Sequence, residues 1–206
     1  DNTCVVSEAP SIELDKSFEC YCIQLTCAIN GVTYIPYTRE QSLSRIVPAL
    51  EELNPTRIFC INDDCEAIWR KRGINATNIF KIKSRQGVIT PLDISENIFV
   101  YIMFSSGTSG TPKAIPITRK NLISYINSIE TIVMIEPNRG YSQVAALTFD
   151  LSIHDIYLCF SNSGFICPIE NKEAILADRF INDLSISYWM SVPSTATFIF
   201  QHAKKK

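Results

Sequence analysis

The sequence is poor in glycine and contains no long apolar run. Its 206 residues include only 7 glycines. The longest uninterrupted apolar run covers residues 98–104, whereas a membrane-spanning helix needs about 20 apolar residues. The first residues show neither the basic nor the apolar segment of a secretory signal peptide. We therefore expect no membrane association. A hydrophobic content of 46% with 19% charged residues also excludes a disordered tail.

No excess charge of either sign is present. The chain has 19 basic and 21 acidic residues, which gives a net charge of −2. Proteins that bind nucleic acid through its phosphates usually show a clear basic excess or a basic patch. The balance of charge therefore predicts no nucleic-acid partner.

Cysteine is present, but not in the amount or spacing of a disulfide scaffold or a zinc site. Eight cysteines in 206 residues fall well below the roughly 8–10% of small disulfide-rich domains. Zinc sites need closely spaced pairs, often with histidine, and the two histidines of this chain have no cysteine at such spacing. We expect reduced, buried thiols, no metal site and a cytoplasmic location.

Helix and strand patterns alternate from residue 18 onward. Apolar residues recur at helical spacing over residues 18–29, and a continuous apolar run at 98–104 is typical of a strand buried on both faces. Residues 144–147 also predict a strand, whereas residues 62–95 look irregular apart from one possible strand at 79–82. Short strands that alternate with helices predict an α/β fold with layered, largely parallel sheets flanked by helices.

Single residues refine the helix boundaries. Pro48 interrupts a helical pattern, so we expect a kink or two shorter helices there. Thr118 and Ser152 each precede apolar residues at helical spacing and are expected to cap those helices, and Gly164 is expected to end the second.

The loop after the apolar strand has the composition of an anion site. It reads Phe104-Ser105-Ser106-Gly107-Thr108-Ser109-Gly110-Thr111-Pro112-Lys113. Glycines let backbone N–H groups turn inward, hydroxyls add donors, and lysine adds positive charge, which together suit phosphate oxygens. The spacing departs from the standard P-loop, which requires G-x-x-x-x-G-K-[ST]. From composition alone, a phosphate loop and a plain serine-rich surface turn both remain open.

Residues 101–113 closely resemble the signature loop of the adenylate-forming enzymes, Y-T-S-G-T-T-G-x-P-K-G. This group includes acyl- and aryl-CoA synthetases, luciferases and the adenylation domains of nonribosomal peptide synthetases. Ser105 and Ser109 replace threonines of the motif, and Ala114 replaces a glycine. Residues 28–36, 147–157 and 188–194 resemble further segments in the family's order. The nearest resemblance is to peptide-synthetase adenylation domains and D-alanine–carrier protein ligases.

The resemblance implies an ATP-dependent reaction. A carboxylate attacks the α-phosphate of ATP, pyrophosphate leaves and an acyl-adenylate forms; in the nearest relatives the acyl group then passes to a carrier protein with a phosphopantetheine arm. Mg²⁺ would assist, with ligands mostly outside this chain. The implied phosphate-binding residues are Ser105, Ser106, Gly107, Thr108, Ser109, Gly110 and Lys113. Thr108 and Lys113 are the implied catalytic residues.

The resemblance also assigns a substrate site. Asp150 matches the aspartate that binds the amino group of an amino acid, and Leu151, His154 and Ser191 match pocket-lining positions. From the residues alone, Asp150 could instead cap a helix, because aspartate is a favoured N-cap. We expect Asp155 only to complement the helix dipole.

The family's later segments, "YGPTE" and "YxTGD", have no counterpart in the chain. The resemblance therefore predicts that residues 1–206 form a partial AMP-binding N-terminal domain without the C-terminal catalytic subdomain, inactive by itself. Two alternatives to an amino-acid-activating enzyme remain: a noncatalytic remnant that serves as a scaffold, and an acyl-CoA synthetase for a non-amino acid.

Overall fold

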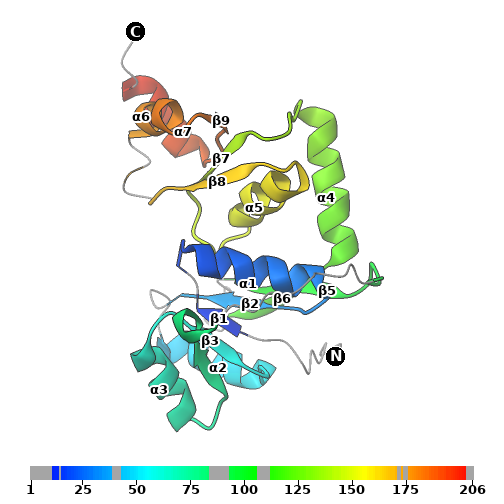
Figure 1. Cartoon of the computed structure of the whole chain (residues 1–206), viewed down its shortest axis with the longest axis vertical. Helices are drawn as coiled ribbons and strands as arrows, with labels where there is room; N and C mark the ends of the chain where they lie inside the picture. The colour runs from blue at the N-terminus through cyan, green and yellow to red at the C-terminus, as the bar shows by residue number, and fades with distance from the viewer. Residues whose placement is uncertain are drawn as a thin grey trace. The chain divides into compact units, whose positions relative to one another are not determined.

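The computed structural model describes residues 11–13, 15–38, 43–83, 93–105, 112–170, 173 and 176–202. The chain divides into two compact units, Asp1–Ile123 and Ser124–Lys206 (Figure 1). The elements are β1 (Ser11–Glu13), α1 (Phe18–Ile29), β2 (Ile35–Tyr37), α2 (Leu43–Leu53), β3 (Ile58–Cys60), α3 (Asp63–Lys71), β4 (Ala76–Asn78), the 3-10 helix η1 (Ile79–Lys81), β5 (Phe99–Ser105), β6 (Lys113–Thr118), α4 (Arg119–Ile132), β7 (Gly140–Gln143), α5 (Leu151–Ser161), β8 (Phe165–Pro168), α6 (Ala177–Asp183), β9 (Ile186–Tyr188) and α7 (Pro193–His202). The predicted α/β class with largely parallel sheets flanked by helices is confirmed.

The first unit contains a four-stranded parallel sheet in the order β2-β1-β3-β4. Figure 1 shows α1 on the opposite side of this sheet from α2 and α3. Apolar side chains of α2 and α3 pack on strand residues such as Ile35 and Ile58, which are fully buried. Trp69 of α3 donates its indole N–H to the Tyr37 hydroxyl at 3.0 Å, so its polar atom is satisfied within this core.

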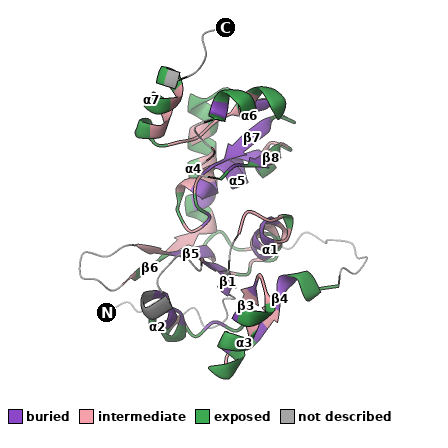
Figure 2. Cartoon of the chain, turned by 90° about the vertical axis from the view of Figure 1, so that its left-hand side faces the viewer, coloured by how far each residue is buried: buried purple, intermediate pink, exposed green. Residues whose placement is uncertain are grey.

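A second, antiparallel pair of strands, β5 and β6, joins the same unit. Tyr34, just before β2, forms an isolated parallel bridge with Tyr101 of β5. The Tyr34 N–H donates to the Val100 carbonyl at 3.1 Å, and the Ile102 N–H donates to the Tyr34 carbonyl at 2.9 Å. The strand predicted at residues 98–104 is confirmed, with its centre buried, as the purple colour of β5 in Figure 2 shows.

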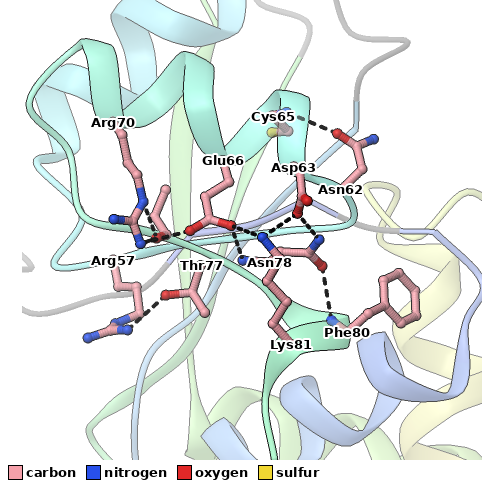
Figure 3. A network of polar contacts seen from close by, with 11 residues as sticks. Arg57, Asn62, Asp63, Cys65, Glu66, Arg70, Thr77, Asn78, Phe80 and Lys81 are labelled. Carbon is pink, nitrogen blue, oxygen red and sulfur yellow. Dashed lines mark hydrogen bonds and ion pairs between the residues drawn. The ribbon is translucent and has the colours of Figure 1, made fainter.

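A polar network ties α3 to β4 and η1 in the first unit (Figure 3). Asn78 donates its side-chain amide to Asp63 at 2.5 Å, and its backbone N–H to Glu66 at 3.3 Å. Lys81 lies 2.7 Å from Asp63, and Arg70 lies 2.7 Å from the second oxygen of Glu66. Asparagine at the end of β4 therefore fixes the start of α3 through two carboxylates.

The second unit contains a three-stranded parallel sheet in the order β8-β7-β9. One apolar cluster joins Tyr141 to Leu158 and Cys159 of α5 and to Ile126 and Ile129 of α4. Another joins Val144 and strand residues to Phe180 and Ile181 of α6. Figure 2 shows buried residues in purple along β7, between the helices of this unit.

Gly164 is required by close packing. A Cβ at this position would lie 2.7 Å from the Arg139 carbonyl oxygen and 2.8 Å from the Tyr141 ring. We expected Gly164 to end α5. The left-handed residue after α5 is instead Ser163, at φ +54°, so Gly164 does not end the helix through a left-handed conformation.

Two other local predictions have opposite outcomes. The Thr118 hydroxyl accepts from the Asn121 N–H at 3.1 Å, which confirms the predicted cap of α4. We expected a kink or two shorter helices at Pro48, and the second alternative is wrong, because α2 runs as a single helix through the proline. Ile46, Val47 and Leu50 are buried on either side of the proline, and their packing offsets the lost backbone hydrogen bond.

None of the helices within the described ranges is long and apolar enough to cross a membrane.

Candidate functional site

The two ends of the predicted phosphate loop are held opposite each other. Ser105 ends β5 and Lys113 begins β6, and the two residues are partners in the antiparallel register. Ser105 is half-buried, because it continues the buried strand, whereas Lys113 is exposed. A hydroxyl and an ammonium group thus stand at the two ends of the loop. This donor chemistry fits phosphate oxygens.

The other predicted phosphate contacts lie outside the described residues. They are Ser106, Gly107, Thr108, Ser109 and Gly110. Their roles stay predictions from the resemblance.

Asp150 stands at the N-cap position of α5, but its side chain does not cap the helix. Its backbone is helical, at φ −60° and ψ −26°, and its carboxylate makes no capping hydrogen bond. The side chain is exposed. Ser152, which we expected to be the cap, lies inside the helix and donates its hydroxyl to the Phe149 carbonyl at 2.7 Å. The Asp150 carboxylate therefore remains accessible to an outside cation, which the capping alternative did not anticipate.

His154 follows Asp150 by one turn of α5, so the two residues lie on one side of the helix. The Tyr125 hydroxyl of α4 lies 2.8 Å from His154 Nδ1, and the rings meet edge to face with centroids 6.0 Å apart. Burial lowers the pKa of His154 below 6.5. At neutral pH the imidazole is therefore mainly uncharged. Its expected role in pocket shape and polarity stays a prediction.

The acidic residues of α5 influence Tyr125. Burial raises the pKa of this phenol above 10.0, and the negative charges of Asp155 and Asp150 raise it further. Tyr125 therefore keeps its proton over the physiological range. The sequence predicted a helix after Thr118 but assigned Tyr125 no role in the site.

Ser191 and Asp150 follow neighbouring strands of the second sheet. Ser191 lies three residues after β9, and Asp150 lies seven residues after β7. Because β7 and β9 are parallel, both segments leave the same edge of that sheet, where ligands of open α/β sheets bind. The Ser142 hydroxyl accepts from the Met190 N–H at 3.3 Å and so fixes the backbone just before Ser191. Leu151 is half-buried at the start of α5.

Asp155 is buried rather than a surface residue of the first helical turn. Only 2% of its surface is exposed, and α5 has no acidic residue in its first turn. Our expectation that it only complements the helix dipole is therefore wrong. The one indication of this burial in the sequence is the position of Asp155 between Ile153 and Ile156, which are buried.

Within the described ranges, no group of three or more histidine, cysteine, aspartate or glutamate side chains could hold a metal ion.

Comparison with known proteins decides the family. Residues 11–206 match the AMP-binding enzyme family. The chain belongs to this family. Among curated relatives, it is 24% identical over 200 residues to an L-proline–[L-prolyl-carrier protein] ligase of Pseudomonas fluorescens, covering 90% of this chain and 40% of the relative. It is 25% identical over 181 residues to a D-alanine–D-alanyl carrier protein ligase of Listeria welshimeri, covering 81% and 34%.

Two solved structures share the fold. The Vibrio cholerae adenylation domain AlmE, in complex with glycyl-adenosine-5'-phosphate, superposes with a TM-score of 0.79 at 21% identity, covering 94% of this chain and 42% of that one. The O-succinylbenzoate coenzyme A synthetase MenE of Bacillus subtilis, in complex with AMP, gives a TM-score of 0.82 at 13% identity, covering 97% and 53%. The present chain thus spans 34–40% of the length of the two curated relatives.

Proposed function

We propose that the protein containing this chain activates an amino acid with ATP. A carboxylate oxygen of the amino acid forms a bond to the α-phosphorus, and the bond from that phosphorus to the bridging oxygen of pyrophosphate breaks. The products are an aminoacyl-adenylate and pyrophosphate. Residues 1–206 would form part of the large N-terminal domain of this enzyme.

The observation that carries the proposal is the state of Asp150. Its carboxylate is exposed at the head of α5 and makes no capping bond. Among the described residues, it has no hydrogen-bond or ion-pair partner. An ammonium group of a bound amino acid supplies the missing charge-assisted hydrogen bonds. A fatty acid offers no such group, so Asp150 favours an amino acid over the substrates of acyl-CoA synthetases.

The phosphate contacts are assigned to the loop between β5 and β6. Lys113 would neutralise charge on the phosphate oxygens as pyrophosphate leaves, and the hydroxyls of Ser105 and Thr108 would donate hydrogen bonds. Preorganised donors of this kind stabilise charge that develops in the transition state. The pairing of Ser105 with Lys113 supports this role, because it fixes the two ends of the loop. Mg²⁺ would share this neutralisation through ligands outside the described residues.

A carrier protein is the proposed acceptor of the activated amino acid. Two curated relatives are carrier protein ligases by name, and a phosphopantetheine thiol would attack the adenylate carbonyl and displace AMP. We also propose a reducing, cytoplasmic setting. Seven cysteines of the described chain are free thiols, which supports it.

Pyrophosphate exchange tests the proposal. Labelled pyrophosphate should enter ATP in the presence of the full-length gene product and one or a few amino acids. Fatty and aryl acids serve as the comparison. Exchange that requires a fatty or aryl acid would favour the acyl-CoA synthetase alternative, and no exchange with any acid would favour a noncatalytic protein.

A further inference from the structure

The pair formed by Tyr125 and His154 is the part of the candidate pocket that the proposed function leaves unexplained. The two residues come from different helices, α4 and α5, and their side chains meet at 2.8 Å from the phenol oxygen to Nδ1. This is the only hydrogen bond of either side chain among the described residues. Nε2 of His154 therefore has no protein partner in that part of the chain.

Two arrangements of the protons suit this contact, and they differ in which ring nitrogen of His154 carries the hydrogen. A neutral imidazole has one N–H donor and one acceptor nitrogen. When the phenol donates to Nδ1, Nδ1 is the acceptor and the ring hydrogen lies on Nε2. The opposite arrangement places the ring hydrogen on Nδ1 and leaves Nε2 as the acceptor. The partner of one ring nitrogen thus determines what the other can do.

We propose that Tyr125 is a positioning residue that holds His154 as the Nε2–H tautomer, so that the pocket selects amino acids whose side chain carries a neutral hydrogen-bond acceptor. This inference rests on the proposed function, because it assigns His154 to the same amino-acid pocket as Asp150. A hydroxyl or amide oxygen, as in serine, threonine or asparagine, would accept from Nε2–H.

Charge and packing narrow the substrate class further. Asp150 and Asp155 are close enough to Tyr125 to raise its pKa, so the surroundings of His154 are acidic. They disfavour a substrate with a carboxylate side chain, because like charges repel. An apolar side chain of the same shape would fit but would leave the half-buried Nε2–H donor of His154 without a partner. A site built to hydrogen-bond its substrate discriminates strongly against such an analogue.

The first test measures the tautomer directly. The full-length gene product is labelled with ¹⁵N-histidine, and the signal of His154 is assigned by its loss in His154→Gln. Near pH 8 the ¹⁵N shifts should show hydrogen on Nε2. Tyr125→Phe removes only the hydroxyl and should shift the ring toward a mixture of both tautomers.

The second test measures selectivity. The kcat/KM for pyrophosphate exchange is compared for threonine against valine and for serine against alanine, which differ mainly by a hydroxyl. We expect the wild type to prefer the hydroxylated member and Tyr125→Phe to lose about 3- to 10-fold of that preference, the value of one hydrogen bond. Tyr188→Phe is the matched control. Its hydroxyl donates to the Met134 carbonyl at 3.1 Å and accepts from the Glu136 N–H at 2.7 Å.

Each result bears on a separate claim. Hydrogen on Nδ1 in the wild type, or a selectivity ratio unchanged by Tyr125→Phe, overturns the inference. An Nε2–H tautomer lost in Tyr125→Phe, with no exchange for any amino acid, contradicts the proposed function and supports the positioning role.

If Tyr125→Phe does not fold, a second comparison decides the inference. His154→Gln keeps an amide donor near Nε2 and should retain the preference, whereas His154→Leu should lose it. Equal preference in the two variants overturns the inference.

Discussion

Ser105 and Lys113 are register partners at the end of the β5–β6 pair. The loop between them carries most of the predicted phosphate contacts. Main-chain pairing therefore holds the two ends of the loop at a fixed separation. β5 in turn is anchored by buried residues and by its bridge to Tyr34. Ser105 and Lys113 themselves therefore need little reorganisation when a ligand arrives.

Loss of the ammonium group at the loop end should slow adenylation. We expect Lys113→Ala to lower the rate of pyrophosphate exchange by about 10²–10³-fold, the usual effect of removing one preorganised contact to developing charge. The measurement is steady-state exchange with the preferred amino acid. Thr108→Ala should act in the same direction.

Lys71→Ala is the control for this prediction. Lys71 is also exposed and belongs to the same unit, but it lies in the last turn of α3. Its loss should leave exchange unchanged. Equal rates for Lys113→Ala and wild type would remove the loop from the phosphate site.

Close packing at Gly164 predicts a steric penalty. Gly164→Ala places a Cβ against the Arg139 carbonyl and the Tyr141 ring, and we expect the free energy of unfolding to fall by about 1–3 kcal/mol. Ser163→Gly is the matched change one residue earlier. It relieves a left-handed φ of +54° and should not destabilise the protein. The measurement is denaturant unfolding of both variants. A larger loss of unfolding free energy in Ser163→Gly than in Gly164→Ala would contradict the packing argument.

The network around Asp63 predicts an acid-sensitive contribution to stability. Hydrogen bonds from Lys81 and then Asn78 lower the pKa of Asp63 below 3.8. A lowered carboxylate pKa stabilises the folded state at pH values above the unfolded value of about 3.8, and this contribution is lost as the pH falls through the folded value.

Asp63→Asn should therefore unfold more easily than wild type at pH 7. The difference between the two proteins should shrink as the pH falls below about 3.8. Unfolding followed by circular dichroism across this range is the measurement. A difference that grows toward acid pH would contradict the assignment.

The sequence predicted elements best where apolar residues follow a clear pattern. The helix at residues 18–29 and the strand at 98–104 are examples. It failed where polar residues are buried. We predicted a strand at residues 144–147, but β7 covers Gly140–Gln143. Ser142 and Gln143 are fully buried there, and the Gln143 side chain donates to the Ala145 carbonyl at 2.6 Å. Burial of polar residues in this way leaves no apolar pattern in the sequence.

The region 62–95 was predicted as mostly irregular, which is wrong for α3 and β4. Asn62 caps α3 by accepting from the Cys65 N–H at 2.9 Å, and Asp63 and Asp64 follow it in the first turn. This N-terminal capping pattern can be recognised in the sequence. The helix was nevertheless missed, because most of its surface is polar. The predicted strand at residues 79–82 is instead η1.

The candidate site divides in the same way. Two continuous segments, residues 101–113 and 147–157, identified the loop residues and Asp150 as candidates, because each motif is local in sequence. The partnership of Tyr125 with His154 could not be predicted, because the residues are 29 positions apart and only the packing of α4 on α5 brings them together.

The most direct test of the amino-acid-activating function is to remove the charge of Asp150. Asp150→Asn keeps the shape of the side chain and removes its charge, and Asp178→Asn, at an exposed acid in the first turn of α6, is the control. For pyrophosphate exchange with the preferred amino acid, we expect Asp150→Asn to lower kcat/KM by about 10- to 150-fold, the value of a charged hydrogen bond, and Asp178→Asn to leave it unchanged. Undiminished amino-acid-dependent exchange in Asp150→Asn would contradict the proposed role of Asp150 in substrate binding.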